Sequence, residues 1–457
     1  MTATPATPAA SLTPGPSPTV PPPPTFTPPP TNTAVPTVTP TSQPQINPVL
    51  QVTAPVVPEG VSTPATAIPT AVPTFEAPPG ITNVLLLGND FPLREGDVQR
   101  TDTMIIVSIN RNGPTASMIS LPRDLYVYIP GGNMQRLNTA VTLGGVELLK
   151  QTILYNFGVP INYYARVDFA GFEQIVDAIG GVEITVTCRF EDWRLKSPEL
   201  DIEDPDNWEL QALEPGVHQL DGDAALWYAR SRLRSSDFDR NRRQQQLLRA
   251  MFNQGVDLNL IPRVPELWNT FQDTVETDMD IGRILQIASL APAIRENGVQ
   301  NLYLVGKMQP WTVPEVNQQV QLPIWEGPNM MRETFQRLFL PPALNKATRA
   351  PIRVEVINAS SNPDLARLAA DNLAWYGFVP IINPEPASPG SPTSLSYYAP
   401  NFKGSYDWLI SWILHMDRSG IALVEDEADY AYNYRAVVGD DYDPCLNPFF
   451  APQSLIP

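Results

Sequence analysis

Six arginines lie within the segment RSRLRSSDFDRNRRQQQ, residues 230–246, although the 457-residue chain has a formal net charge of −18. At 3.6 residues per helical turn, Arg240, Arg243, Gln244 and Leu247 share one face of a helix. A helix that only faced solvent would place its arginines opposite its leucines. We therefore expect this face to turn toward the core and to open, at its first turn, into an anion-binding cleft.

A second group of charged residues flanks three short apolar segments. NVLLLG, TMIIVSI and ASMISL each have the composition of a buried strand. In an antiparallel meander the end of the first strand, the start of the second and the end of the third meet at one sheet edge. Two carboxylates and two guanidinium groups are expected at that edge: Asp90, Arg100, Asp102 and Arg123.

These residue types suit a pyrophosphate ligand. An arginine donates two parallel hydrogen bonds to phosphate oxygens, and Mg²⁺ joins carboxylates to phosphate, so we predict Asp90 and Asp102 as magnesium ligands. Phosphoryl transfer relies on positioning and charge neutralisation, and needs no histidine. The proton of an acceptor hydroxyl could pass to Asp237, to Asp102 or to a metal-bound oxygen, and all three alternatives stay open.

A plainer interpretation applies to the same charges. A single aspartate more often caps a loop or pairs with an arginine, and four arginines could form a solvated face paired with Asp237 and Asp239: Arg230, Arg232, Arg240 and Arg243. Four charged groups at one predicted sheet edge favour the binding site. We assign three further arginines to a solvated or salt-bridged face: Arg234, Arg242 and Arg249.

The elements around these residues alternate between helix and strand from about Ile81 to about Leu340. GGVELLKQTILYNFG and DFAGFEQIVDAIGG have helical periodicity and end at glycines, and the strand VEITV follows. This alternation predicts an α/β fold, a layered α/β/α domain with a mixed central sheet. Residues 189–214 are acidic and interrupted by proline, which predicts a surface insertion able to act as a lid.

Three regions are predicted along the chain. Residues 1–79 are mostly Pro, Thr, Ala, Ser and Val without Lys or Arg, which is typical of a disordered, semi-rigid stalk. Residues 80–345 form the α/β/α domain. Residues 346–457 contain a βαβ-βαβ pattern that predicts a smaller α/β domain, interpreted as a binding or spacer module because it shows no cluster of catalytic groups.

The composition disfavours several classes of function. Nucleic acid and anionic membranes need a broad basic surface, so with a net charge of −18 the arginine segment is interpreted as a local site. A histidine-dependent hydrolase is disfavoured, because the chain has only two histidines and no Gly-x-Ser-x-Gly motif. Cys188 and Cys445 are too few for a disulfide framework and lack the companions of a zinc site, and we assign them no chemistry.

Several segments together resemble the LytR-CpsA-Psr family of cell-wall glycopolymer ligases. The resemblance covers most of residues 81–340 and rests on motifs in matching order and spacing: NVLLLGND, RTDTMIIVSIN, SLPRDLYVYIP, RLNTA, GVPINYYARVDFAGFEQIVDAIGGVEITV and LDGDAALWYARSRLRSSDFDRNRRQQQLL. The segments IRVEVINAS, LARLAADNLAWYGF and RAVVGDD are similar to the C-terminal domain of members named LytR.

The resemblance implies a Mg²⁺-dependent phosphotransferase that moves a glycopolymer from a polyprenyl-pyrophosphate carrier to a muramic acid hydroxyl of peptidoglycan. It implies that Asp90 and Asp102 hold the metal and that six arginines surround the pyrophosphate, with Gln244 orienting one of these groups: Arg100, Arg123, Arg230, Arg232, Arg240 and Arg243. We expect Arg123, Asp102, Asp237 and Arg230 to be catalytic. The lipid requires an apolar tunnel, for which VELLKQTILYNF and FEQIVDAI are candidates.

Two other functions remain as alternatives, a non-catalytic protein that binds the wall or the lipid carrier, and a polyprenyl-pyrophosphate hydrolase with water as acceptor. Family members act outside the cytoplasm and usually carry an N-terminal transmembrane helix. This sequence has no run of 18 apolar residues. We therefore expect an extracytoplasmic protein of the cell envelope, anchored through a segment absent from this sequence. Either the true start lies upstream of Met1, or an export segment has been omitted, or the protein is unusual among family members. Contact with the membrane is expected only through the lipid substrate or this missing anchor.

Overall fold

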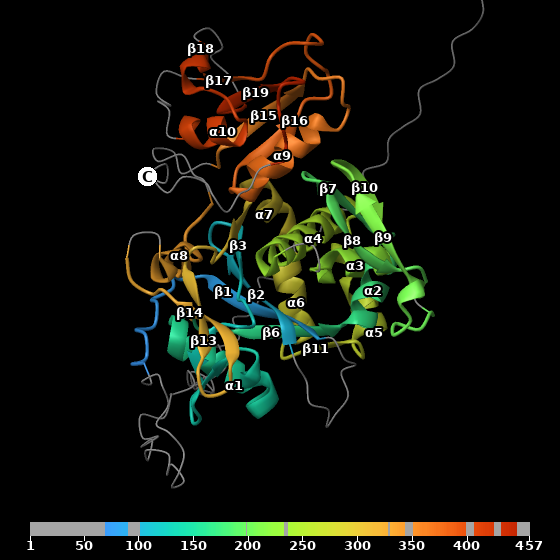
Figure 1. Ribbon diagram of the computed structural model, residues 1–457. Coiled ribbons are helices and arrows are strands. Elements are labelled where there is room, and N and C mark those ends of the chain that lie inside the picture. Colours follow the sequence, from blue (N-terminus) through green and yellow to red (C-terminus); the bar gives the residue numbers. More distant parts are fainter. Residues whose placement is uncertain are drawn as a thin grey trace, which may run out of the picture. The chain divides into compact units, whose positions relative to one another are not determined.

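The computed structural model describes residues 69–89, 101–197, 199–232, 236–327, 330–342, 351–398, 406–424 and 431–445 (Figure 1). All of them belong to a single unit that extends from Val57 to Pro457. Two of the predicted site residues, Asp90 and Arg100, lie outside the described residues.

A six-stranded mixed sheet forms the centre of the larger domain. Its order is β11-β6-β1-β2-β3-β12, in which β1 pairs parallel with β6 and β3 pairs parallel with β12, while the other neighbours are antiparallel. The predicted meander is confirmed in β1, β2 and β3. The strands are β1 (Ile81–Asn89), β2 (Thr101–Asn110), β3 (Thr115–Ser120), β6 (Tyr163–Asp168), β11 (Val275–Thr277) and β12 (Val299–Leu302).

Helices cover both faces of this sheet, which confirms the predicted α/β/α layering (Figure 1). On one face Leu85 and Ile106 pack with α1 (Thr139–Phe157) and α8 (Met331–Arg337). On the other face Val84 and Ile109 pack with α4 (Asp237–Asp257), α6 (Ile281–Ala288) and α7 (Ala291–Asn297). Because β1 and β2 are buried on both faces, their sequences are continuous apolar runs.

The remaining helices and strands of this domain flank the central layers. Three small sheets pair β4 with β5, β7 with β10, and β13 with β14: β4 (Tyr126–Tyr128), β5 (Met134–Arg136), β7 (Val182–Val186), β10 (Gly216–Leu220), β13 (Met308–Val313) and β14 (Gln318–Pro323). The helices are α2 (Phe169–Ala178), α3 (Gly222–Arg230), α5 (Val264–Phe271) and the 3-10 turn η2 (Ile261–Arg263).

Residues 69–79, which the sequence assigns to the stalk, pack against α1 instead. The Val72 amide donates to the Tyr155 carbonyl at 2.9 Å, and the Phe75 ring packs against the core cluster. Gly158, at φ 68°, ends α1 here, and a Cβ atom at this position would lie 2.4 Å from the Pro73 carbonyl oxygen. The Pro/Thr-rich composition of this segment gives no sign that Phe75 packs into the core. The predicted stalk boundary at residue 79 is therefore wrong, because residues 69–79 belong to the folded domain.

The acidic insertion at residues 189–214 forms a two-stranded hairpin, β8 (Phe190–Leu195) and β9 (Trp208–Leu213), with the 3-10 turn η1 (Pro205–Asn207) before β9. Phe190 at its base is buried and contacts Trp227 at 5.0 Å between ring centroids. Trp193 alternates to the opposite side of the strand and is 45% exposed. The hairpin is therefore fixed to the core at its base, and its function as a lid stays a prediction.

The C-terminal region forms a second sheet of order β16-β15-β19-β17-β18. β15 pairs parallel with β16, which confirms the first predicted βαβ unit. The second predicted unit is wrong, because β17 pairs antiparallel with β19, the strand of RAVVGDD, and its parallel partner is the short strand β18. A separate core packs around Val354 and Leu368. Its elements are β15 (Arg353–Asn358), α9 (Leu365–Trp375), β16 (Val379–Ile382), β17 (Ser394–Tyr398), α10 (Asp407–Ile413), η3 (Arg418–Gly420), β18 (Ala422–Val424) and β19 (Tyr434–Val438).

A disulfide joins Cys188 to Cys445, 257 residues apart in the chain. It links the segment before β8 to the segment after β19. Sequence reasoning assigned these two cysteines no chemistry, because only the folded chain brings them together. None of the helices in the described ranges is at once long and apolar enough to span a membrane.

Candidate functional site

The arginine segment begins α4, and local sequence sets the start of the helix. Ser236 accepts a hydrogen bond from the Asp239 amide, and the Asp239 carboxylate accepts from the Ser236 amide at 2.9 Å, which forms a capping box. Arg240 and Arg243 are then 5% and 6% exposed, and Gln244 is 9% exposed. The predicted inward orientation of this arginine-bearing face is confirmed.

Arg123 and Asp102 meet at the sheet edge predicted from the meander. Arg123 follows β3 and Asp102 lies at the start of β2, and the Arg123 Nη1 atom donates to Asp102 Oδ2 at 2.7 Å. Burial lowers the pKa of Arg123, but the hydrogen bond and charge of Asp102 outweigh it, so the pKa is raised overall. The pair therefore holds a charged guanidinium group at this edge.

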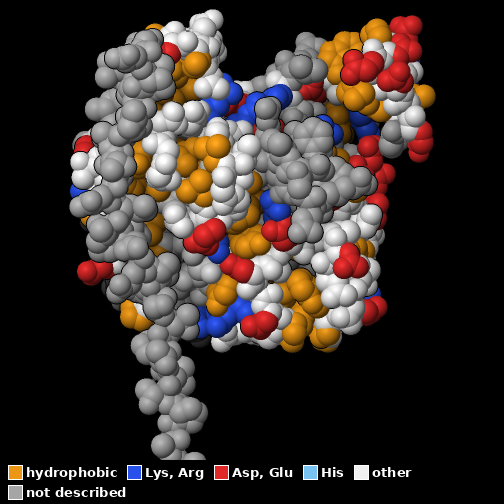
Figure 2. Space-filling view, turned by 90° about the horizontal axis from the view of Figure 1, so that it is seen from below, with side chains coloured by type: hydrophobic (Ala, Val, Ile, Leu, Met, Phe, Trp, Pro, Cys, Tyr) orange, Lys and Arg blue, Asp and Glu red, His pale blue; other side chains and the backbone are white. Residues whose placement is uncertain are grey.

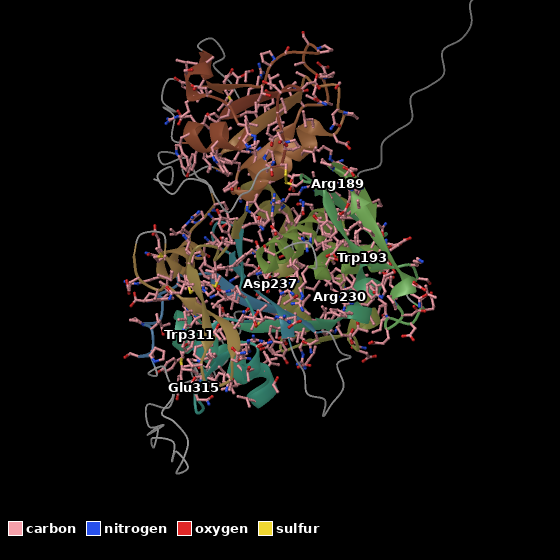
Figure 3. The ribbon with its side chains drawn as sticks, viewed as in Figure 1. Arg189, Trp193, Arg230, Asp237, Trp311 and Glu315 are labelled. Atoms are coloured by element: carbon pink, nitrogen blue, oxygen red, sulfur yellow. A yellow bond between two sulfur atoms is a disulfide. The ribbon has the colours of Figure 1, made fainter. Side chains whose placement is uncertain are left out.

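Asp237 connects this pair to the start of α4. Its Oδ1 atom lies 3.6 Å from Arg240 Nη1 and 3.8 Å from Arg232 Nη1. Burial is the largest cause that lowers the Arg240 pKa; the charge of Asp237 opposes it, and those of Arg232 and Arg123 add to it. The charges of these four residues and of Asp102 therefore influence one another electrostatically. Figure 3 labels Arg230, the last residue of α3, and Asp237, the first residue of α4.

The Arg243 side chain hydrogen-bonds to backbone carbonyls at the end of α3. Its Nε atom donates to the Tyr228 carbonyl at 2.7 Å, its Nη2 atom donates to the Ser231 carbonyl, and its guanidinium carbon lies 4.5 Å from the Phe190 ring centroid. Burial lowers the pKa of Arg243. The side chain therefore binds the end of α3, which carries Arg230, and direct contact between Arg243 and pyrophosphate stays a prediction.

An apolar cavity lies between the central sheet and helices α2, α3 and α4; together with its opening to solvent it spans about 640 Å³. Arg230 and Gln244 form part of its lining. The Arg230 guanidinium carbon lies 4.0 Å from the Phe169 ring centroid, and Gln244 Nε2 donates to the Ala229 carbonyl at 3.2 Å. Among the described residues, the buried Gln244 Oε1 atom has no hydrogen-bond partner. The cavity thus has apolar walls and a polar margin supplied by predicted site residues.

The two segments expected to line a tunnel differ in position. Phe172 of FEQIVDAI lines the cavity. VELLKQTILYNF instead packs into the core on the opposite face of the sheet, where Leu149 and Ile153 are fully buried. Of the two segments only α2 lines this cavity, because the periodicity of an apolar stripe does not tell which face of the sheet it covers. That the cavity holds the lipid stays a prediction.

The predicted magnesium ligands are represented by Asp102 alone, since Asp90 lies outside the described residues. Asp102 Oδ2 binds Arg123, and a carboxylate of this kind fits Mg²⁺ through its other oxygen. Within the described ranges no group of three or more Asp, Glu, His or Cys residues is arranged to hold a metal ion. A magnesium site here would need Asp90, phosphate oxygens and water as further ligands.

Of the arginines that the sequence assigns to a solvated or salt-bridged face, Arg249 is salt-bridged but buried, and its partner belongs to the second domain. Arg249 is 6% exposed and pairs with Asp371, and the Arg242 guanidinium carbon lies 5.2 Å from the Trp375 ring centroid. Both partners belong to α9, so these arginines contact the C-terminal domain. Sequence reasoning also missed Phe169 and Phe190 as partners of Arg230 and Arg243, since no sequence signal separates them from ordinary core aromatics. Arg234 lies outside the described residues.

The distribution of charge agrees with a local site. On the face shown in Figure 2, basic side chains lie next to acidic ones and among apolar ones, with no broad basic area on that view. The arginines of α3 and α4 act over a short range, because opposite charges nearby screen their field.

Comparisons with known proteins agree on one family. The LytR_cpsA_psr family model matches residues 66–325. The chain is 34% identical over 223 residues to the polyisoprenyl-teichoic acid–peptidoglycan teichoic acid transferase TagU of Oceanobacillus iheyensis, covering 47% of this chain and 64% of that protein. It is 30% identical over 227 residues to the transferase TagT of Bacillus subtilis, covering 49% of this chain and 67% of TagT.

Among solved structures, the crystal structure of B. subtilis TagV aligns with a TM-score of 0.47 at 24% identity, covering 57% of this chain and 98% of TagV. The chain spans about two thirds of the length of the TagU and TagT relatives.

Proposed function

This chain belongs to the LytR_cpsA_psr family, and from this we propose that it transfers a glycopolymer from a polyprenyl-pyrophosphate carrier to peptidoglycan through a phosphodiester bond. One observation carries the proposal: Arg230 and Gln244 lie both in the charged region and in the lining of the apolar cavity. A lipid diphosphate has the same two parts, a charged head and an apolar tail. The proposal extends to this chain the activity that the names of the TagU and TagT relatives state.

The proposed reaction is a phosphoryl transfer. The oxygen of a peptidoglycan hydroxyl forms a bond to the phosphorus that carries the polymer, and the bridging P–O bond breaks. Polyprenyl monophosphate leaves, and the hydroxyl proton passes to a carboxylate. Asp237 suits this last step, since its side chain is 41% exposed whereas Asp102 is hydrogen-bonded to Arg123. Arg123, Arg230, Arg232 and Arg240 would neutralise the diphosphate.

We propose Mg²⁺ as the cofactor, held by Asp102 and Asp90. When bound, it would neutralise phosphate charge that the arginines leave uncompensated. The support is chemical. A carboxylate next to arginines does not attract phosphate by itself, and Asp102 has one oxygen that Arg123 Nη1 does not engage.

We also propose an extracytoplasmic location at the cell envelope and a LytR-type C-terminal domain. The disulfide between Cys188 and Cys445 supports the location, because disulfides persist mainly in oxidising compartments. The parallel pairing of β15 with β16 around α9 supports the domain type, since it matches the first βαβ unit that the C-terminal motifs predict.

The test incubates the purified chain with a polyprenyl-pyrophosphate-linked oligosaccharide, with and without Mg²⁺ and a peptidoglycan acceptor, and identifies products by mass spectrometry. We expect a phosphodiester-linked product that requires the acceptor and decreases with chelator. Release of sugar phosphate without acceptor would instead support a hydrolase. Binding without turnover in any arm would support a non-catalytic binding protein.

A further inference from the structure

Helix α4 has two functional faces. Arg240 and Gln244 face the candidate site, while Arg242, Gln246 and Arg249 contact α9 of the C-terminal domain or residues beside it. Arg249 Nη2 donates to Asp371 Oδ1, and Gln246 Nε2 donates to Asp371 Oδ2 at 3.3 Å. A single carboxylate of the second domain therefore binds two successive turns of the helix that carries the site arginines.

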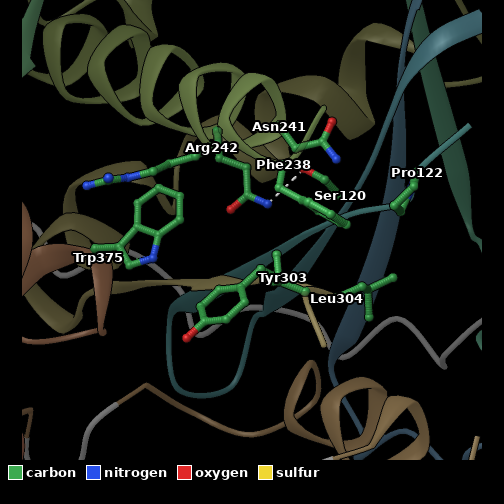
Figure 4. A pocket seen from close by; sticks show the side chains of 10 residues that line it. Ser120, Pro122, Phe238, Asn241, Arg242, Tyr303, Leu304 and Trp375 are labelled. Carbon is green, nitrogen blue, oxygen red and sulfur yellow. Dashed lines mark hydrogen bonds between the residues drawn. The ribbon is translucent and has the colours of Figure 1, made fainter. Parts of the chain in front are cut away.

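From Asp371 a buried chain of hydrogen bonds runs to the sheet edge. Arg249 Nη1 donates to Asn301 Oδ1 at 3.2 Å, Asn301 Nδ2 donates to Gln245 Oε1 at 2.9 Å, and Gln245 Nε2 donates to Ser120 Oγ at 2.8 Å. Ser120 is the last residue of β3 and lies three residues before Arg123. Figure 4 shows Ser120 and Arg242 around a small pocket on this side of α4, with Trp375 of the second domain on the same pocket.

A second branch leads from Asp371 to the other arginines. Gln246 Oε1 accepts a hydrogen bond from the Tyr228 hydroxyl at 2.8 Å, and the Tyr228 carbonyl accepts from Arg243 Nε at 2.7 Å. Tyr228 lies in the last turn of α3, two residues before Arg230. Both branches therefore end at segments that place site arginines, one at the end of β3 and one at the end of α3.

We propose that Asp371 is a positioning residue. Through it, the C-terminal domain holds α4 and the arginines of this helix at a fixed position relative to the sheet edge that carries Arg123. The proposal gives this domain a function in the transfer reaction and rests on the proposed function of the site. The contacts are buried: Gln245 is 2% exposed, Asn301 4% and Gln246 6%. A buried polar group without a hydrogen-bond partner costs free energy. Loss of Asp371 would therefore favour a different position of the Arg249 side chain and, with it, of α4.

The disulfide keeps the two domains joined when a single contact is removed, so a variant at Asp371 tests positioning and leaves the domains attached. A matched control exists at the same boundary. Arg367 of α9 pairs with Glu183 of β7, and their side chains are 45% and 43% exposed. This ion pair joins the same two domains. The Glu183 backbone amide also donates to Gln254 Oε1 of α4 at 3.4 Å, a bond that Arg367→Ala leaves in place.

The experiment compares Asp371→Ala, Asp371→Asn and the control Arg367→Ala in the full-length chain, by turnover of a polyprenyl-pyrophosphate-linked oligosaccharide and by hydrogen exchange of the α4 amides. We expect Asp371→Ala to lower kcat by about 10- to 100-fold with KM little changed, because the arginines are misplaced for the transition state. Asp371→Asn keeps one acceptor oxygen and should lower kcat less. Exchange in α4 should rise by about tenfold or more in Asp371→Ala and stay at the wild-type rate in Arg367→Ala.

Wild-type turnover and wild-type α4 exchange in both Asp371 variants would overturn the proposal. An equal loss in Arg367→Ala would also overturn it, since domain attachment in general would then be responsible. If Asp371→Ala does not fold by circular dichroism, Asp371→Asn alone decides. If the wild-type chain shows no turnover, the proposed transferase function fails, and the exchange comparison still decides whether Asp371 holds α4.

Discussion

The guanidinium group of Arg230 lies over the ring of Phe169, with 4.0 Å between the guanidinium carbon and the ring centroid. Arg230 ends α3, and Phe169 begins α2 directly after β6. The contact places a cation at the margin of the apolar cavity, where both residues form part of the lining. A ring face next to a cation stabilises that position by about 0.5–2 kcal/mol.

Replacing Phe169 tests this contact. Phe169→Leu keeps an apolar side chain but removes the ring face, so we expect the KM for the lipid-linked substrate to rise by about three- to tenfold. Phe172→Leu is the matched control, since Phe172 lines the same cavity and packs against an apolar cluster of described side chains. Steady-state kinetics measures the difference. Equal effects of the two substitutions would show that only cavity shape matters.

Arg123 and Asp102 should be essential for turnover. Arg123→Ala removes a cation that would neutralise developing charge, and we expect a loss of about 100-fold or more in kcat. Asp102→Ala should have a similar effect, because it removes both the partner of Arg123 and the predicted metal ligand. Arg263→Ala, in an exposed pair with Glu266, serves as control. Retained turnover in both folded site variants would contradict the assignment of the site.

Filling the cavity should separate lipid binding from diphosphate binding. Ala229→Phe places a ring in the apolar lining. Excluding about two methylene groups of the lipid should weaken binding of a long-chain polyprenyl pyrophosphate by about tenfold, while a water-soluble short-chain analogue binds as before. Isothermal titration calorimetry with both ligands measures this, with Ala229→Ser as control. Unchanged long-chain affinity in Ala229→Phe would place the lipid elsewhere.

The disulfide should stabilise the chain. Because it closes a loop of 257 residues, its removal in Cys188→Ser/Cys445→Ser should lower the free energy of unfolding by about 2–5 kcal/mol. Thermal unfolding followed by circular dichroism, with and without reductant, measures this. Reductant should lower the Tm of the wild type and leave the double variant unaffected. Two free thiols in the oxidised wild-type protein, found by mass spectrometry, would contradict the pairing.

Glu173 of α2 should make stability depend on pH. Burial raises its pKa, the nearby charges of Asp223 and Asp177 raise it further, and Arg230 opposes them. The folded state therefore favours the protonated form of Glu173. The free energy of unfolding is unaffected by this group below its unfolded pKa of 4.5, and it decreases as the pH rises through the higher pKa of the folded state. Glu173→Gln should raise the Tm slightly at pH 7 and leave it unchanged at pH 3.5. The effect is small because Glu173 is only partly buried, so that solvent screens these charges. A lower Tm at pH 7 would contradict this sign.

The sequence by itself determined the elements and much of the site. Apolar runs bounded by turn residues predict β1, β2 and β3, and the geometry of a meander then requires Asp102 and Arg123 at one edge, where they form a pair at 2.7 Å. The helical spacing of Arg240, Arg243 and Gln244 predicts their common inward face. These inferences succeed because they depend on local periodicity and on strand connectivity.

Tertiary structure alone decided which surfaces meet. Arg249 has the sequence context of a solvated or salt-bridged face, and only the tertiary structure shows that its partner is Asp371, 122 residues away, and that Arg249 is buried. The pairing of Cys188 with Cys445 and the packing of α1 on the face opposite the cavity have the same origin. Contacts between distant segments depend on the shape and volume of both surfaces, and no local pattern of side chains encodes these.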